Sequence, residues 1–478
     1  MATKDATPAE TGRNSFVYVV AALAALNGLL FGFDTGVIAG AMLYIQNSFD
    51  LTALFGYPMS ASFVEGLIVS GAMGGAIVGA AFGGRLADQL GRRRLILVGA
   101  VIFFVGSLVM AIAPNVEVLI FGRLINGVGI GFASVVGPLY ISELAPPKIR
   151  GSLVSLNQLT ITSGILVAYL VNYAFSGGGD WRWMLGLGMI PAVVLFVGML
   201  FMPESPRWLY EQGRVDDARD VLSRTRTESR VAEELREIKE TVRTESGTVG
   251  DLFKPWVRPM LVVGVGLAAF QQVTGINVVM YYAPVILEST GFQDTASILA
   301  TVGIGVVNVV MTVVAVLLID RTGRRPLLLT GLVGMTVMLG LLGLAFFLPG
   351  LSGIVGWLAT IGLMLYVAFF AIGLGPVFWL LISEIYPTQI RGTAMGAATV
   401  VNWAANLLVS LTFLGLVDAV GQASTFWLFG ACSLVALVFC YKLVPETKGR
   451  SLEEIEADLR ENTLVGPDDH PDAVGSDD

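Results

Sequence analysis

The segment DQLGRRR at residues 88–94 and its second copy, DRTGRRP at residues 320–326, decide how this chain folds. Each copy is a short charged stretch between two long apolar runs. Two more motifs recur in the same order: SEL at 142–144 returns as SEI at 383–385, and PES at 203–205 returns as PET at 445–447. Motifs repeated in the same order predict an internal duplication, in which each half of the chain is one structural unit.

The composition indicates a membrane protein. Among the 478 residues, 55% are hydrophobic and only 14% are charged, and the mean hydropathy is +0.75. These values exclude a soluble globular protein and leave room for about a dozen spans of ~20 apolar residues. The apolar runs predict an all-α integral membrane protein with twelve transmembrane helices, at residues 16–43, 62–84, 95–114, 118–141, 152–175, 182–202, 258–287, 295–319, 327–348, 354–383, 392–416 and 422–444.

Lys and Arg are distributed unevenly among the loops between these runs. Of the 29 basic residues, all but Arg123 and Arg182 lie in alternate loops or near the chain ends. The positive-inside rule therefore predicts a multi-pass protein of the plasma membrane with both termini in the cytoplasm. Six spans per copy give the two halves the same orientation, which makes this a parallel pseudo-repeat. The expected parts are a cytoplasmic N-terminus at 1–15, a six-helix half at 16–202, a cytoplasmic helical linker at 203–256, a second six-helix half at 257–444 and a cytoplasmic tail at 445–478.

The first apolar run carries an acid, Asp34, and the fourth carries a base, Arg123. A charged side chain deep in a bilayer costs at least ~2.5–3.5 kcal/mol on insertion scales, so it normally faces a cavity and has a partner. Counted along each helix from the nearest polar segment, both residues lie at similar depth near the same face of the membrane. We expect Asp34 and Arg123 to form a buried, compensating ion pair.

Several motifs stand together in an order that is specific to one known family. They are Gly83 to Arg94, Gly122-Arg123, Pro203 to Arg207, Gln271 to Asn277, Gly375-Pro376 before Trp379, and Pro445 to Gly449. From about Phe16 to Arg450 the chain resembles the sugar porter family of the major facilitator superfamily. The resemblance implies the major facilitator fold and transport by alternating access, in which one half rocks on the other around a midplane site.

Amide side chains in the predicted helices are suitable for binding a sugar. A polyol needs groups that both donate and accept hydrogen bonds, and a flat apolar surface for its C–H groups. The candidate substrate-binding residues are Gln158, Ile161, Ile165, Gln271, Gln272, Asn277, Asn308, Trp379 and Asn402. An isolated amide such as Asn308 fits an interhelical hydrogen bond equally well, and such a bond is worth typically ~0.6 kcal/mol in membrane proteins.

Two of these assignments require broken helices. In an ideal helix Gln272 and Asn277 point about 140° apart, so both can face one ligand only if Gly275 loosens the seventh helix. Trp379 comes soon after Gly373 and a Gly-Pro pair. This predicts a similarly broken tenth helix, with the indole available to stack on a sugar ring.

The repeated loop motifs pair acids with bases. The residues concerned are Asp88, Arg92, Glu143 and Arg150 in the first half and Asp320, Arg324, Glu384 and Arg391 in the second. Resemblance to the family implies that they form a cytoplasmic salt-bridge gate between the halves, closed when the sugar site faces outward. The alternative is a set of solvated loop charges that only fixes orientation. The positive-inside rule does not need the acids, which favours the gate.

These features predict a secondary active transporter that takes up a neutral monosaccharide, a hexose or a pentose, with proton symport through Asp34 and Arg123. The expected partners are a small-molecule sugar, a proton and the lipid bilayer, with no cofactor, metal, nucleic acid or obligate protein partner. Alternatives are an uncoupled facilitative uniporter, a sodium-coupled symporter and a non-transporting sugar sensor. Asp34 resembles the proton-coupled members, whereas Ile165 and Asn402 resemble the facilitator pattern. No metal, nucleophile or phosphate motif indicates an enzyme.

Overall fold

The computed structural model describes residues 8–145, 150–224, 226, 228–244, 249–348, 350, 353–387 and 390–449, without the side chains of 8–19, 21, 150–155, 229, 240–244, 249 and 320. The chain divides into two compact units, Met1–Thr244 and Glu245–Asp478. The division lies inside the stretch 203–256 that the sequence predicts as a linker.

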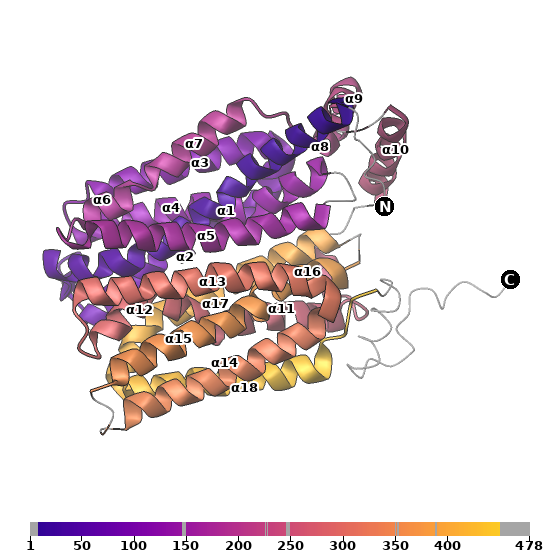
Figure 1. Ribbon diagram of the computed structural model, residues 1–478. Helices are drawn as coiled ribbons and strands as arrows, with labels where there is room; N and C mark the ends of the chain where they lie inside the picture. The colour runs from indigo at the N-terminus through magenta and orange to yellow at the C-terminus, as the bar shows by residue number, and fades with distance from the viewer. Residues whose placement is uncertain are drawn as a thin grey trace. The chain divides into compact units, whose positions relative to one another are not determined.

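The first unit contains a transmembrane bundle and three short helices that follow it (Figure 1). Its elements are α1 (Pro8–Ser48), β1 (Ala53–Leu54), β2 (Tyr57–Pro58), α2 (Ala61–Leu90), α3 (Arg92–Ala111), α4 (Val116–Leu144), α5 (Arg150–Ser176), α6 (Trp181–Gly186), α7 (Met189–Leu200), α8 (Pro206–Glu211), α9 (Val215–Ser223) and α10 (Glu228–Thr244).

The second unit repeats the bundle. Its elements are η1 (Val249–Phe253), α11 (Arg258–Val273), α12 (Ile276–Glu288), α13 (Asp294–Thr322), α14 (Arg324–Phe347), α15 (Val355–Ile372), α16 (Leu374–Ile385), α17 (Arg391–Val420) and α18 (Gln422–Leu443). Within it, α14 packs along α15 and α18, α13 along α15, and α11 along α17.

Twelve segments within the described residues are long and apolar enough to cross a bilayer. Their number and order are those predicted from the sequence, which confirms the all-α membrane fold. The first helix is longer than its predicted range of 16–43, because α1 runs from Pro8 to Ser48.

Three of the twelve spans are interrupted. In the seventh, Gly275 adopts a left-handed conformation (φ +91°) between α11 and α12, and in the tenth Gly373 separates α15 from α16. Both breaks were expected. The sixth span also breaks, between α6 and α7, because Pro191 lacks the N–H that would bond the carbonyl of Leu187. That carbonyl instead accepts the tighter bond from the N–H of Ile190 at 3.1 Å.

Glycines allow the helices of the first unit to pack at very short range. α1 packs along α5, and α4 packs between α2 and α3. A Cβ on Gly75 would lie 2.1 Å from the carbonyl oxygen of Leu124, and one on Gly127 would lie 1.9 Å from that of Ala72. The backbones of α2 and α4 are therefore in contact, as small residues permit in membrane bundles.

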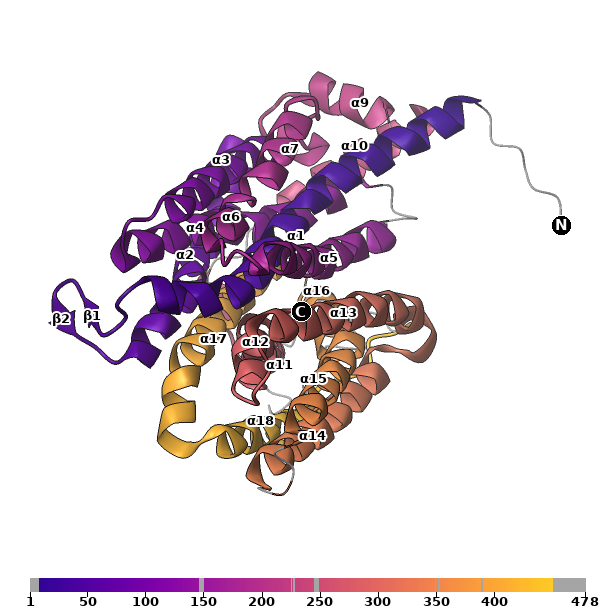
Figure 2. The ribbon, with the colours of Figure 1, turned by 60° about the vertical axis from the view of Figure 1, so that its left-hand side comes forward.

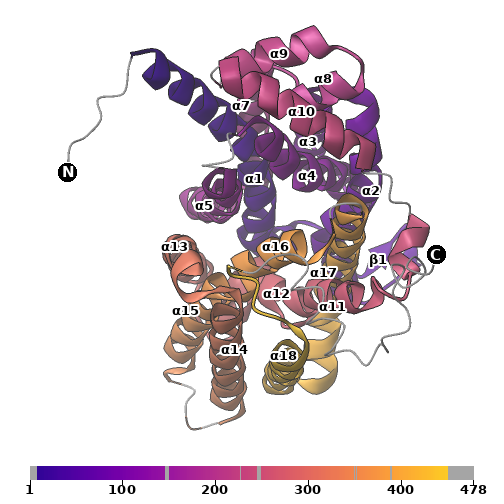
Figure 3. The same cartoon turned by 90° about the vertical axis from the view of Figure 1, so that its right-hand side faces the viewer.

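The three short helices α8 to α10 are fixed to one end of the first bundle (Figure 3). The indole N–H of Trp208 donates to the carbonyl of Asp88 at 2.8 Å. The guanidinium of Arg226 donates to the carbonyls of Leu144 and Ala145, each at 3.1 Å, and pairs with Glu234 at 2.6 Å. These contacts hold α8 to α10 against the ends of α2 and α4.

At the opposite end, a hairpin of β1 and β2 joins α1 to α2 (Figure 2). Its tip residue Phe55 has a positive φ of 51° and donates its backbone N–H to Glu117 at 2.9 Å. The carboxylate of Glu117, in the first turn of α4, therefore fixes the position of the hairpin.

Candidate functional site

The expected ion pair between Asp34 and Arg123 is present inside the first unit. Nη1 of Arg123 lies 2.7 Å from Oδ1 of Asp34, and the two side chains are 0% and 2% exposed, respectively. An ion pair with this little exposure is not screened by water, so its charge–charge attraction is strong. Counting depth along two separate helices thus identified two charges that meet in space.

Arg123 also bonds to the backbone of α2. Its Nε donates to the carbonyl of Ile68 at 3.1 Å, and its Nη2 donates to the carbonyl of Val69 at 3.0 Å. The guanidinium therefore connects α4 to both α1 and α2. If Asp34 lost its charge, Arg123 would still have two acceptors on α2.

Asn126 is a third member of this site, and the sequence interpretation missed it. Its amide Nδ2 donates to Oδ1 of Asp34 at 2.8 Å. Asn126 follows Arg123 by three residues, so the two side chains lie on the same face of α4. That spacing was a usable signal, but an amide is less conspicuous in an apolar helix than a charge is.

The candidate sugar residues of the first unit lie on α5, which packs against the helix that carries Asp34. A Cβ on Gly32 would lie 1.9 Å from the carbonyl oxygen of Ile161, and one on Gly36 would lie 2.7 Å from that of Ile165. Gln158, one turn earlier on α5, is half-buried. The acid and the candidate sugar residues of this unit are therefore joined by direct helix contact.

Four amides of the second unit form one hydrogen-bonded network. Asn277 Nδ2 donates to Gln272 Oε1 at 2.6 Å, which is possible because Gly275 turns the chain between them. Gln272 Nε2 donates to Asn402 Oδ1 at 3.1 Å, and Asn402 Nδ2 donates to Gln271 Oε1 at 2.8 Å. The structure thus brings together the four amides that the sequence assigned to one site.

The same network reaches the break in the tenth span. Gln271 Nε2 donates to the carbonyls of Leu374 and Gly375 at 3.2 and 3.4 Å. These carbonyls lie in the first turn of α16. The network therefore joins the broken seventh span, the broken tenth span and α17.

Trp379 and Asn308 lie outside this hydrogen-bonded network in the described part of the unit. Trp379 is half-buried on α16 and its ring packs on that of Phe378, with centroids 4.7 Å apart. Asn308 is buried on α13, and its backbone carbonyl accepts from Thr312.

The loop motif of the first unit forms a compact ion cluster. Arg92 Nε lies 3.0 Å from Glu143 Oε2, and Arg92 Nη1 lies 3.2 Å from Asp88 Oδ1 and 3.8 Å from Glu211 Oε2. Arg92 and Glu143 are almost fully buried, whereas the Asp88 side chain is 66% exposed. Glu204 adds a second layer by accepting the backbone N–H of Arg93 at 2.9 Å.

The second unit repeats this cluster with the equivalent residues. Arg324 Nη2 lies 3.0 Å from Glu384 Oε1, and the hydroxyl of Thr447 donates to the other carboxylate oxygen of Glu384. Glu446 accepts the backbone N–H groups of Arg324 and Arg325 at 3.0 and 3.1 Å. Each ion pair lies within one unit, at the end of α4 or α16.

The remaining gate residues of the sequence analysis are Arg391, Arg150 and Asp320. Arg391 donates its Nε to the carbonyl of Tyr386 at 3.1 Å. The side chains of Arg150 and Asp320 lie outside the described residues. Burial raises the pKa of the Tyr386 phenol above its ordinary value.

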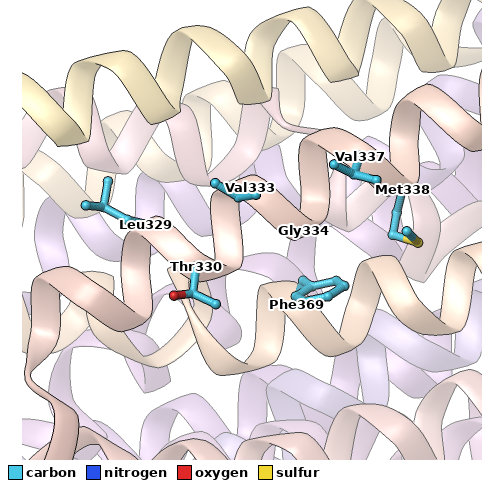
Figure 4. A pocket seen from close by; sticks show the side chains of 7 residues that line it. All are labelled: Leu329, Thr330, Val333, Gly334, Val337, Met338 and Phe369. Carbon is cyan, nitrogen blue, oxygen red and sulfur yellow. The ribbon is translucent and has the colours of Figure 1, made fainter.

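A groove of about 470 Å³ lies between α14 and α15 (Figure 4). It is lined by Leu329, Thr330, Val333, Gly334, Val337, Met338 and Phe369. The hydroxyl of Thr330 is bonded within α14, to the carbonyl of Pro326 at 2.8 Å. This lining offers apolar contact and almost no hydrogen bonding, so it does not match a polyol.

Comparison with known proteins gives consistent matches over most of the chain. A family model described as "Sugar (and other) transporter" matches residues 20–459. A D-xylose transporter of Levilactobacillus brevis is 45% identical over 451 residues, covering 94% of this chain and 96% of the relative. A galactose-proton symporter of Escherichia coli is 43% identical over 460 residues, covering 95% and 97%. A partially occluded, inward-open structure of the xylose transporter XylE from E. coli matches with a TM-score of 0.81 and 34% identity, covering 92% of this chain and 100% of that one.

Proposed function

Because this chain belongs to the sugar porter family of the major facilitator superfamily, we propose that it takes up a neutral monosaccharide together with a proton. Sugar transport, and not enzymatic catalysis, is the activity of the family. Relatives described as a D-xylose transporter and a galactose-proton symporter support a pentose or a hexose as the substrate.

The amide network of the second unit supports the sugar part of the proposal. Amides both donate and accept, and therefore complement hydroxyl groups that do the same. Gln271, Gln272, Asn277 and Asn402 are already bonded to one another. A network held in this way keeps the amides oriented for a ligand, so less ordering free energy is lost on binding.

The ion pair between Asp34 and Arg123 is the single observation that carries the proton part. Burying an acid with one basic partner inside a bundle costs free energy, so such a pair indicates a functional role. A proton on Asp34 removes its attraction to Arg123. Arg123 then keeps its bonds to the carbonyls of Ile68 and Val69, so it stays attached to α2 while its attraction to α1 is weakened.

Helix packing provides a route from this acid to the sugar. α1 carries Asp34 between Gly32 and Gly36, which are pressed against α5 at Ile161 and Ile165. A displacement of α1 on protonation is therefore passed directly to α5. In this proposal, the candidate residues of α5 contribute to sugar binding during alternating access.

We test the proton assignment with Asp34→Asn in proteoliposomes. The amide imitates a protonated acid, so the variant is expected to lose uphill accumulation and sugar-induced alkalinisation while counterflow of labelled sugar continues. Asp50→Asn is the matched control. Asp50 lies just beyond α1, and hydrogen bonds from the Thr52 hydroxyl and backbone hold its pKa below the usual range. It stays charged during transport, so its replacement leaves accumulation intact.

Two other outcomes would reject this assignment. If Asp34→Asn still concentrates sugar with a proton gradient as the sole energy source, the coupling site lies elsewhere. If counterflow and folding fail together, the ion pair is a permanent joint between α1 and α4, and uncoupled uniport becomes the better proposal.

A further inference from the structure

Asn126 on α4 is an amide in an unusual environment. Its side chain is 1% exposed, and its Nδ2 donates to Oδ1 of Asp34 at 2.8 Å. Its own oxygen, Oδ1, is buried and has no hydrogen-bond partner among the described residues. The bond to Asp34 is therefore the only side-chain hydrogen bond of Asn126 in this part of the chain.

This arrangement is poor for stability. A buried polar atom without a partner lowers stability, and a leucine of similar shape would not carry that cost. The backbone of α4 is also tightly packed here, since a Cβ on Gly106 of α3 would lie 2.7 Å from the N of Asn126. The packing of α4 thus holds Asn126 at a fixed position, where its amide acts on Asp34.

Both donors to the carboxylate converge on the same oxygen. Arg123 Nη1 and Asn126 Nδ2 bond to Oδ1 of Asp34, and no described donor bonds to Oδ2. Oδ2 is therefore the oxygen left to accept a proton. Asn126 and Arg123 together keep the carboxylate turned so that Oδ2 stays available.

We propose that Asn126 is a positioning residue that sets the pH range in which Asp34 takes up its proton. This inference rests on the proposed role of Asp34 in coupling. A hydrogen bond donated to a carboxylate favours its charged form. Asn126 is one of the two donors, with Arg123, that favour the charged carboxylate in this way.

Asn126 is a neutral hydrogen-bond donor to Asp34, and it differs in this from the charged groups on the neighbouring helices. α4 supplies Arg123 and, in its first and last turns, Glu117 and Glu143. α2 carries Glu65 one turn before Ile68, and α6 carries Arg182, whose guanidinium stacks on Trp181 at 4.2 Å. α5 from Leu156 to Ser176 and α7 contain no Asp, Glu, Lys or Arg. Asn126 is the neutral donor that can be removed without changing any of these charges.

The test compares Asn126→Leu with wild type in proteoliposomes of varied external pH. Uphill sugar accumulation is divided by counterflow at each pH, so that only the proton-dependent step is measured. Loss of the donor is expected to move the midpoint of this ratio upward by about one to two pH units, given the usual strength of a hydrogen bond to a charged group. Asn126→Ala removes the same donor without adding volume and should show the same shift.

Asn172→Leu is the matched control. Asn172 is also a buried amide with an unpartnered Oδ1, but its Nδ2 donates to the carbonyl of Gly36 at 3.0 Å. It should leave the pH midpoint where it is in wild type. Melting temperatures of the purified variants show whether both Leu substitutions are tolerated.

The outcomes separate this inference from the proposed function. An unchanged midpoint in both Asn126 variants, with accumulation abolished in Asp34→Asn, would reject the role of Asn126 and leave Asp34 as the coupling acid. Continued accumulation in Asp34→Asn would reject the coupling role itself, and with it the inference. An equal shift in Asn172→Leu would show a general effect of packing on the bundle.

Discussion

At the scale of single residues, the sequence was most informative where a side chain contradicted its surroundings. Asp34 and Arg123 were identifiable because charges are rare in apolar helices, and their depth predicted that they meet. Asn126 was missed, since an amide causes much less conflict with an apolar helix than a charge. Its bond to Asp34 depends on the rotation of α4 about its axis, which the sequence alone shows only as a spacing of three from Arg123.

The amide network leads to a prediction at this scale. Gln272→Ala and Asn277→Ala each remove side-chain partners from the cluster, so a sugar hydroxyl bound there loses about one hydrogen bond and the buried partner is left unsatisfied. We expect each substitution to weaken sugar binding by about 1–3 kcal/mol, or roughly 5- to 150-fold in Kd. Isothermal titration calorimetry with the transported sugar measures this directly.

Asn172→Ala serves as the control for that measurement, because it removes a buried amide from the contact of α5 with α1. Its Kd should match wild type. Wild-type affinity in both cluster variants would place the sugar at another site.

At the scale of elements, glycine and proline indicate where helices break more clearly than hydropathy does. The break in the tenth span was predicted from Gly373, Gly375 and Pro376, and that in the seventh from Gly275, whose φ of +91° a glycine adopts without strain. The break in the sixth span could have been predicted from Pro191, which removes a helical donor. The apolar run there continues without interruption, so a reading by hydropathy treats it as one helix.

Gly275→Ala tests the seventh break. At φ +91° an alanine is strained by about 1–3 kcal/mol, and its Cβ would lie 2.9 Å from the ring of Phe429. We expect a lower Tm and, because the turn aligns Gln272 with Asn277, weaker sugar binding. The two effects are measured by thermal unfolding in detergent and by calorimetry.

Gly415→Ala provides the comparison in the same unit. Gly415 lies within α17, and a Cβ there would meet nothing within 4 Å. Alanine is the better helix former by roughly 0.5–1 kcal/mol, so Tm should stay or rise. A loss of stability equal to that of Gly275→Ala would mean that the left-handed turn is not the cause.

At the scale of the whole molecule, the apolar runs predicted twelve helices, and the repeated motifs predicted two halves whose acids and bases form a gate between them. The pairs of Arg92 with Glu143 and of Arg324 with Glu384 follow from the repeat. The second layer does not, since Glu204 and Glu446 bond to backbone N–H groups more than a hundred residues away. A sequence motif shows that these acids recur, but their acceptor role depends on how the helices are packed.

The last prediction concerns access to the sugar site and the orientation of the chain. We propose that the ion clusters face the cytoplasm and keep the inward path closed. Glu143→Gln or Glu384→Gln leaves Arg92 or Arg324 with a neutral partner, which weakens the closed state. With Cys432 and Cys440 replaced by alanine, a cysteine at Gln158 should then react faster with an impermeant thiol reagent applied from the cytoplasmic side.

Two comparisons make this experiment decisive. A cysteine at the exposed Ser223 of α9 reports orientation, and it should react in intact cells only after permeabilisation. Asp217→Asn removes an ion pair with Arg214 in which both side chains are about half exposed (52% and 51%), and exposed pairs contribute ~0–1 kcal/mol, so reactivity at Gln158 should stay constant. Labelling of Ser223 from outside would invert the orientation. If a buried ion pair closes the path, removing its charge must change how often the path opens. Equal reaction rates in both Glu variants and in Asp217→Asn would therefore mean that the clusters hold the helix ends together within each unit and do not control access.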